Sequence, residues 1–183
     1  MGALVQKYPN DLVTYQELVW ESKPDVLIEM GTLRGGSAYY FASLFDLMGR
    51  GRVITVDIQK FPNLPVHPRI TYLLGSSTSP DIVHEIKELI KPGERVMVSL
   101  DSDHHAPHVL RELEIYSRMV TPGQYLVVED TSINGRPALP GWGPGPAEAI
   151  TAFLTQNHDF APDKSREKFL ITSNPGGWLK RIN

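Results

Sequence analysis

The sequence contains no cysteine, no excess of basic residues and no long apolar run. The lack of cysteine excludes disulfides, cysteine-ligated metals and cysteine nucleophiles, although it leaves the cellular compartment undetermined. A formal net charge of −3 provides no broad basic field, so nucleic-acid binding is not indicated. No apolar stretch approaches membrane-spanning length, and the N-terminus lacks the basic, apolar and small-residue order of a secretion signal. No membrane partner is therefore predicted, and a cytoplasmic location is the default expectation.

The composition that remains is typical of a soluble globular protein. The 183 residues are 41% hydrophobic and 21% charged, which predicts one domain over residues 1–183 with an interior large enough for a core. Residues 1–22 are predicted to form a short N-terminal arm followed by a helix over 11–21, because apolar residues recur there at helical spacing.

Apolar segments of strand length alternate with helical patterns along the rest of the chain. We predict five strands at 25–30, 52–57, 70–74, 95–100 and 124–128, a sixth near Phe160 and a seventh at 168–172. The predicted fold is therefore an α/β, Rossmann-like, doubly wound and mostly parallel seven-stranded sheet with helices on both faces. Residues 161–167 are too few for a crossover helix, so the last strand is expected to be antiparallel.

A glycine-rich turn follows the first predicted strand. In Glu29-Met-Gly31-Thr32-Leu-Arg-Gly35-Gly36-Ser37, the glycines permit a tight turn and leave room for a ligand, and Ser37 is a candidate helix cap. The spacing differs from a dinucleotide fingerprint and resembles the first motif of class I methyltransferases, which bind S-adenosylmethionine (SAM). An ordinary strand-to-helix turn is the alternative.

Polar residues also follow the next two strands, where ligands bind in sheets of this kind. Asp57 ends the second strand, and a carboxylate there accepts hydrogen bonds from both ribose hydroxyls of a nucleotide cofactor. A turn or helix-capping aspartate is the alternative. Gly75, Ser76 and Ser77 follow the third strand, at the expected adenine edge.

Acidic residues gather after the fourth and fifth strands, at Asp101, Asp103, Glu129 and Asp130. Neighbouring carboxylates repel one another unless protons or a cation intervene, and oxygen ligands favour a hard ion such as Mg²⁺. The alternatives are helix-capping acids that face solvent, or a transition metal held with His104 or His105. The segment 131–146, rich in glycine and proline, is predicted to be a lid or substrate loop.

Several motifs together resemble the cephalosporin hydroxylase family. They are Lys7-x-Pro-x-Asp11 with Tyr15-Gln-Glu-Leu18, the glycine turn, Leu100-Asp-Ser-Asp-His104, Val128-Glu-Asp130, and Gly143-Pro-Gly-Pro146 with Ala149-Ile150. The family includes the methyltransferase of cephamycin biosynthesis and is similar to rhamnosyl and macrolide sugar O-methyltransferases. Relative to that pattern, an extra N-terminal segment is expected to be missing or short here.

The resemblance implies a SAM-dependent methyltransferase with Mg²⁺ on Asp101, Glu129 and Asp130. It implies Asp103 as the base that accepts the proton of the acceptor, with His104 as the competing candidate. A small-molecule acceptor and a homo-oligomer are further implied. An NAD-dependent oxidoreductase and a catalytically degenerate ligand-binding module are the alternative functions.

Overall fold

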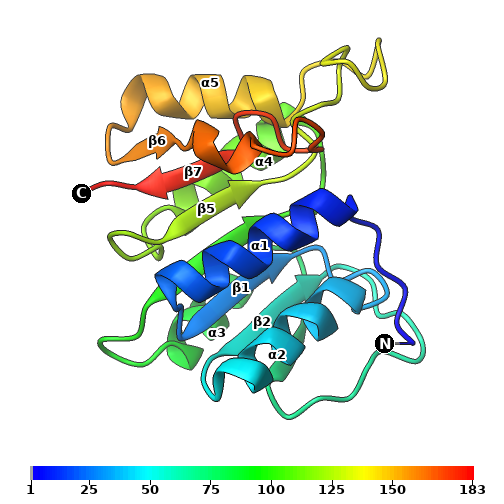
Figure 1. The fold of residues 1–183 in the computed structure, drawn as a ribbon, viewed down its shortest axis with the longest axis vertical. Helices are drawn as coiled ribbons and strands as arrows, with labels where there is room; N and C mark the ends of the chain where they lie inside the picture. The colour runs from blue at the N-terminus through cyan, green and yellow to red at the C-terminus, as the bar shows by residue number, and fades with distance from the viewer. Residues whose placement is uncertain (1) are drawn as a thin grey trace.

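The computed structural model describes residues 2–183, which form one seven-stranded sheet with helices on both faces (Figure 1). The strand order is β3-β2-β1-β4-β5-β7-β6. The first five strands in that order are parallel, while β7 is antiparallel to both β5 and β6. The predicted fold class is therefore confirmed, including the antiparallel last strand.

The strands are β1 (Val26–Met30), β2 (Arg52–Asp57), β3 (Ile70–Leu74), β4 (Val96–Leu100), β5 (Tyr125–Val128), β6 (Phe160–Pro162) and β7 (Trp178–Arg181). The α-helices are α1 (Pro9–Ser22), α2 (Gly36–Met48), α3 (Pro80–Leu89), α4 (Ala106–Tyr116) and α5 (Pro146–Gln156), and Lys164–Glu167 is a short 3-10 helix. None of the helices within residues 2–183 combines the length and the apolar character that crossing a bilayer requires.

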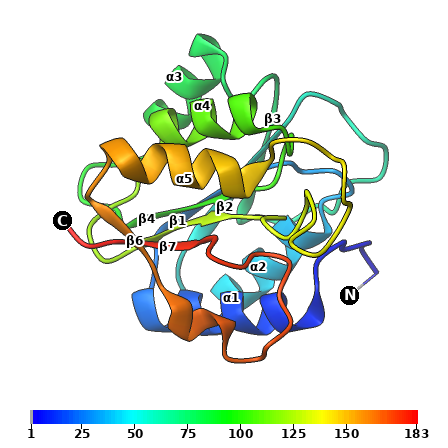
Figure 2. The same ribbon diagram turned by 90° about the horizontal axis from the view of Figure 1, so that it is seen from above.

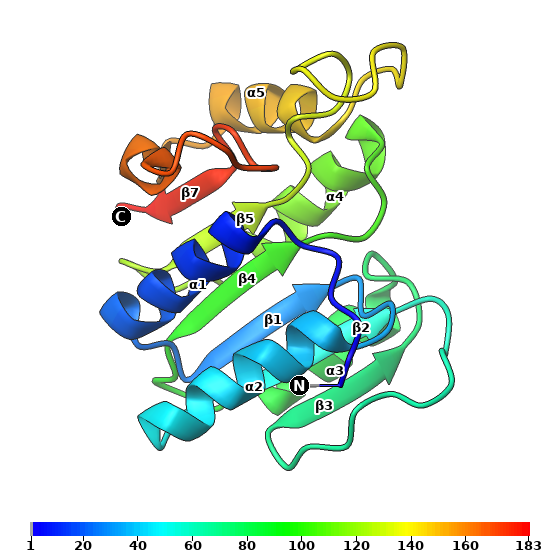
Figure 3. The same ribbon diagram turned by 45° about the vertical axis from the view of Figure 1, so that its right-hand side comes forward.

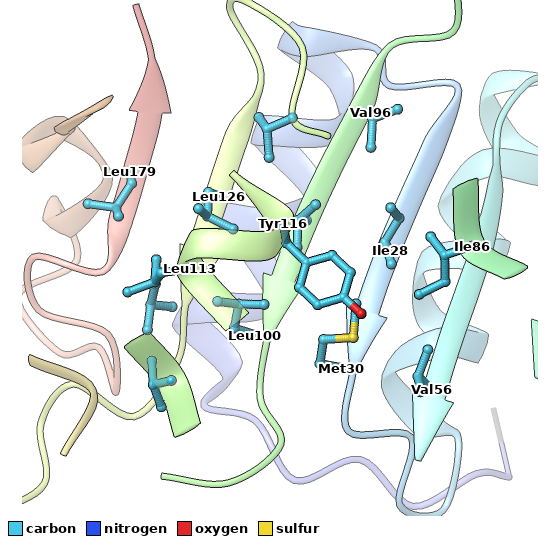
Figure 4. Packing of buried hydrophobic residues seen from close by; sticks show 14 of the residues in the cluster. Ile28, Met30, Val56, Ile86, Val96, Leu100, Leu113, Tyr116, Leu126 and Leu179 are labelled. Atoms are coloured by element: carbon cyan, nitrogen blue, oxygen red, sulfur yellow. The ribbon is translucent and has the colours of Figure 1, made fainter. Parts of the chain in front are cut away.

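Two hydrophobic cores lie on opposite faces of the sheet. Helices α1 and α2 cover one face, and α3, α4 and α5 cover the other (Figure 2). On the second face, Ile86 of α3 and Tyr116 of α4 pack over strand residues such as Ile28 and Met30 (Figure 4). Strand β1 is buried along its whole length because it lies inside the sheet with helices on both sides.

The position of the seventh strand was predicted wrongly. Residues 168–172 form turns and irregular chain, with Leu170 93% exposed, and β7 begins at Trp178 instead. A Cβ atom on Gly177 would lie 2.1 Å from the carbonyl oxygen of Val128, so only glycine permits the close approach to β5 just before the strand starts. The apolar pattern of 168–172 misled the prediction because it gives no information about this contact.

The expected helix cap is also wrong. Helix α2 begins at Gly36 after Gly35 in a left-handed conformation, so Ser37 lies inside the first turn and is not the cap. Of the two tryptophans at the ends of the chain, Trp20 is 63% exposed on α1 and Trp178 is fully buried.

The N-terminal arm folds back over its own sheet. We call residues 2–8 the strap. From the start of α1 the strap runs past the carboxyl ends of β4 and β1 and continues beside α2 (Figure 3). It therefore covers the edge of the sheet at which ligands bind in this class of fold.

Candidate active site

The glycine turn brings three backbone segments together. Gly31 has a φ of +97°, and a Cβ atom there would lie 2.0 Å from the carbonyl oxygen of Asp101. A Cβ atom on Gly36 would lie 2.0 Å from the carbonyl oxygen of Leu4 in the strap. The turn thus contacts the acidic end of β4 on one side and the strap on the other, and both contacts require glycine.

The substitution Gly36→Ala tests the packing of the strap. We expect it to lower the free energy of unfolding by about 1–2 kcal/mol, because the added methyl group overlaps the strap backbone even though alanine is the better helix former. Urea denaturation measures the change. Leu47→Ala, at an 86% exposed position of the same helix, is the control and should change stability by less than about 0.5 kcal/mol. Equal stability of Gly36→Ala and the wild type would mean that the strap does not pack here.

The carboxylate of Asp57 is held beside the same turn. Its Oδ2 accepts the backbone N–H of Leu33 at 2.8 Å, and its Oδ1 accepts the backbone N–H of Gln59 at 2.9 Å. Each oxygen keeps a lone pair for a further donor. Asp57 therefore has the turn-stabilising role that was one alternative, and it also faces the cavity described below.

Glu29 lies beneath the turn rather than on a cavity wall. It is fully buried, and its Oε2 accepts the Thr55 hydroxyl at 2.7 Å. Burial raises the pKa of Glu29. Glu29 does not line the cavity described below, so the cofactor contact that its place before the glycine turn predicts stays a prediction.

The acids after β4 and β5 converge on one lysine. Lys7 of the strap places its Nζ 2.8 Å from Asp101 Oδ2 and 2.5 Å from Glu129 Oε1. Glu129 Oε1 also accepts the Tyr15 hydroxyl at 2.7 Å and the Ser99 hydroxyl at 2.8 Å. One oxygen of Glu129 therefore accepts from three donors, one charged and two neutral.

Burial and mutual repulsion shape the charges of this cluster. Burial raises the pKa of Asp101, the charge of Glu129 adds to the effect, and Lys7 opposes it. Burial also raises the pKa of Asp130. Burial alone would lower the pKa of Lys7, but the charges of Asp101 and Glu129 outweigh it and raise that pKa, so Lys7 is a cation. Three carboxyl groups thus share a small buried region with one ammonium, and carboxylate oxygens are ligands that a hard divalent ion prefers.

His104 joins this group. One oxygen each of Asp101 and Asp130 and one ring nitrogen of His104 lie within 4.8 Å of one another, which is a spacing that accommodates a metal ion. His104 Nε2 lies 3.3 Å from Asp130 Oδ2. Among residues 2–183 this is the only group of three or more such side chains at that spacing, and the oxygen-rich donor set is compatible with Mg²⁺.

Asp103 is oriented differently. Its Oδ1 accepts the backbone N–H of His105 at 3.0 Å and lies 2.6 Å from His105 Nδ1. Burial acts against ionisation, but the hydrogen bonds from His105 prevail and lower the pKa of Asp103. His105 in turn stacks on Trp142 of the 131–146 loop, whose indole N–H donates to the His104 carbonyl oxygen at 3.2 Å. The loop therefore borders the mouth of the site.

These elements enclose a cavity of about 550 Å³, large enough for a nucleoside-sized ligand. The predicted site residues on its walls are Gly31, Thr32, Gly36, Ser37, Asp57, Gly75, Ser76, Ser77, Asp101, Asp103, His104 and Asp130. Glu29, Gly35 and Glu129 do not line it.

Sequence reasoning missed two parts of the wall. Residues 4–7 of the strap line the cavity although they carry no nucleotide-binding motif. His108 of α4 also lines the cavity. Behind it, buried Glu112 accepts the Ser77 hydroxyl at 2.5 Å and the Ser102 hydroxyl at 2.7 Å, and its hydrogen bond raises the pKa of His108. The i, i+4 spacing of His108 and Glu112 was the available signal for this second group.

A family model described as "Rhamnosyl O-methyltransferase/CmcI" matches residues 1–182. The chain belongs to this family. It is 42% identical to the rhamnosyl O-methyltransferase of Mycobacterium tuberculosis (strain H37Rv) over 189 aligned positions, which cover 99% of the chain and 77% of the relative. The rhamnosyl O-methyltransferase of Mycobacterium leprae is 38% identical, with 99% and 82% covered. The predicted family and its O-methyltransferase activity are therefore confirmed.

Solved structures agree with the fold of this family member. CmcI without ligand has a TM-score of 0.73 at 20% identity, covering 97% of the chain and 72% of CmcI. CmcI with Mg and SAM has a TM-score of 0.71 at 20% identity, covering 97% of the chain and 73% of CmcI. The methyltransferase MycE of mycinamycin biosynthesis, with Mg and S-adenosylhomocysteine (SAH), has a TM-score of 0.57 at 21% identity and covers 77% of the chain and 37% of MycE.

Proposed function

We propose that this family member transfers a methyl group from SAM to a sugar hydroxyl with the help of Mg²⁺. The observation that carries the proposal is a group of two carboxylates and one imidazole, from Asp101, Asp130 and His104, on the wall of a cavity that the glycine turn also lines. Methyl transfer requires the cofactor and the reacting hydroxyl to lie next to each other, and this cavity places the glycine turn beside the group that could bind a metal ion. The rhamnosyl activity named for its relatives makes a deoxysugar hydroxyl the acceptor of choice.

The residues of this site fit both cofactors. Backbone N–H groups at the start of α2 suit the carboxylate of SAM, Asp57 suits its ribose, and Ser76 and Ser77 suit its adenine. Asp101, Glu129 and Asp130 would hold Mg²⁺, which prefers carboxylate oxygens as ligands. SAM supplies a methyl group on a good leaving group, and Mg²⁺ makes a bound hydroxyl more acidic.

The chain itself supplies alignment and a proton acceptor. We assign the base to His104, whose Nε2 faces Asp130 inside the cavity. A neutral imidazole accepts a proton near neutral pH, and Asp130 stabilises the imidazolium that forms. Asp103, the other candidate, is a weaker base because its pKa is lowered by His105.

Binding and turnover together test the proposal. Isothermal titration with SAM, SAH and NAD should give binding heat with the first two only. Methyl transfer from labelled SAM to rhamnose-containing glycosides should then depend on added Mg²⁺ and stop with a chelator. Binding of NAD alone would support the oxidoreductase, and binding of SAH without transfer to any hydroxylated acceptor would support the degenerate module.

Asp57→Ala should weaken SAH binding by about ten- to a hundred-fold, because hydrogen bonds to a charged group contribute about 1.5–3 kcal/mol. Titration calorimetry gives the dissociation constant. Asp46→Ala, which removes a surface acid of α2 with a half-exposed side chain, is the matched control and should leave SAH affinity unchanged. Unchanged affinity in Asp57→Ala would remove the ribose role.

A further inference from the structure

Three residues at four-residue spacing direct the N-terminal segment toward the acidic cluster. Asp11 and Tyr15 lie on one face of α1, and Lys7 precedes the helix by two residues. Lys7 and Tyr15 contact the acids directly, whereas Asp11 contacts the segment next to Asn174, which holds the backbone of Asp130. The residues of the motif Lys7-x-Pro-x-Asp11 with Tyr15 therefore all help to hold the acids in place, a role that the proposed reaction does not include.

Lys7 makes the most direct contact. Its side chain is 2% exposed, and its ammonium lies between carboxylate oxygens of Asp101 and Glu129. Tyr15 fixes Glu129 from the helix side through a 2.7 Å hydrogen bond. Lys7 therefore binds one carboxylate oxygen of Asp101 and one of Glu129, and the second oxygen of each carboxylate is left for another partner.

Asp11 is connected to Asp130 indirectly, through Ser173 and Asn174. Its Oδ2 accepts the backbone N–H and the hydroxyl of Ser173, both at 2.9 Å. The neighbouring Asn174, fully buried, accepts the backbone N–H of Asp130 at 2.9 Å. Asp130 has a φ of +54°, an uncommon conformation for a residue other than glycine, so this hydrogen bond helps to hold its backbone in place.

We infer that Lys7 is a positioning residue for the metal carboxylates, fixing Asp101 and Glu129 in the arrangement that accepts a divalent ion. The inference rests on the proposed Mg²⁺ site. The buried ammonium lies between the two carboxylates and binds one oxygen of each, so it fixes their spacing and connects the strap over the cavity to the same acids. Partners that orient metal ligands in this way typically change metal affinity 10- to 100-fold when removed.

The experiment measures metal affinity without turnover. Mn²⁺ serves as a paramagnetic probe for Mg²⁺, and electron paramagnetic resonance reports free Mn²⁺ during titration of the full chain. We expect Lys7→Met to raise the Mn²⁺ dissociation constant about tenfold or more, with Lys60→Met, at an exposed lysine away from the cluster, unchanged.

A second variant separates positioning from folding. Lys7→Ala removes three carbons and the ammonium, so propylammonium added to the buffer should restore Mn²⁺ affinity, whereas propanol should not. Circular dichroism checks that both Lys7 variants are folded.

The outcomes are distinct. Wild-type Mn²⁺ affinity in Lys7→Met, or tighter binding, would overturn the positioning role while leaving the metal site intact. Weak binding in Lys7→Ala that propylammonium does not improve would also overturn it. Absence of Mn²⁺ binding in the wild type would overturn the proposed metal function and this inference together.

Discussion

The Asp101→Asn enzyme should lose metal binding and about a thousand-fold or more in methyl transfer. Asp101 has contacts in every part of the site. Its carboxylate binds Lys7 and lies within metal-binding distance of Asp130 and His104. Its backbone carbonyl oxygen packs against Gly31 of the glycine turn. An amide removes the charge that a hard cation requires. Metal activation of a hydroxyl contributes several kcal/mol, and each 1.36 kcal/mol is tenfold in rate.

Initial rates with labelled SAM and Mn²⁺ titrations measure the two losses. Asp159→Asn changes a half-exposed acid at the opposite edge of the sheet and should behave like the wild type in both. If Asp101→Asn retained Mg²⁺-dependent transfer at a comparable rate, the metal role of the acids after β4 and β5 would be wrong.

The second large effect is expected at His104. His104→Gln should lower the rate of methyl transfer about 10²- to 10⁴-fold, the usual contribution of general base catalysis, while SAH binds with its normal affinity. The glutamine side chain remains polar but cannot accept a proton near neutral pH. Single-turnover rates at saturating Mg²⁺ separate this loss from weaker metal binding.

Asp103→Asn provides the comparison that decides between the two candidate bases. Because Asp103 pairs with His105 and has a lowered pKa, its loss should cost less than about tenfold. The reverse ranking, with Asp103→Asn the slower enzyme, would transfer the role of base to Asp103.

The sequence predicted the architecture because the alternation of strands and helices leaves few topologies. It also predicted which strand ends meet, since parallel strands place their carboxyl ends at one edge. Twelve of the predicted site residues lie on one cavity wall for that reason. The antiparallel last strand followed from a linker too short for a crossover.

The sequence did not predict which side chain stands between the acids. Lys7 is 94 residues from Asp101 and 122 from Glu129, and no local period relates them. The location of β7 was missed for a similar reason, because Gly177 is explained by its contact with Val128 and not by its neighbours in sequence. Contacts between distant segments determine both features, and one sequence contains no direct record of them.

The side of the sheet opposite the cavity is formed by the amino ends of its parallel strands. The turns 49–51, 91–95 and 121–124, which lead into β2, β4 and β5, lie there, and within residues 2–183 none of them lines the cavity. A fluorophore or surface tether joined to these turns would leave the strap free and the cavity open to acceptors. Immobilised enzyme attached in this orientation would present its working face to the solution.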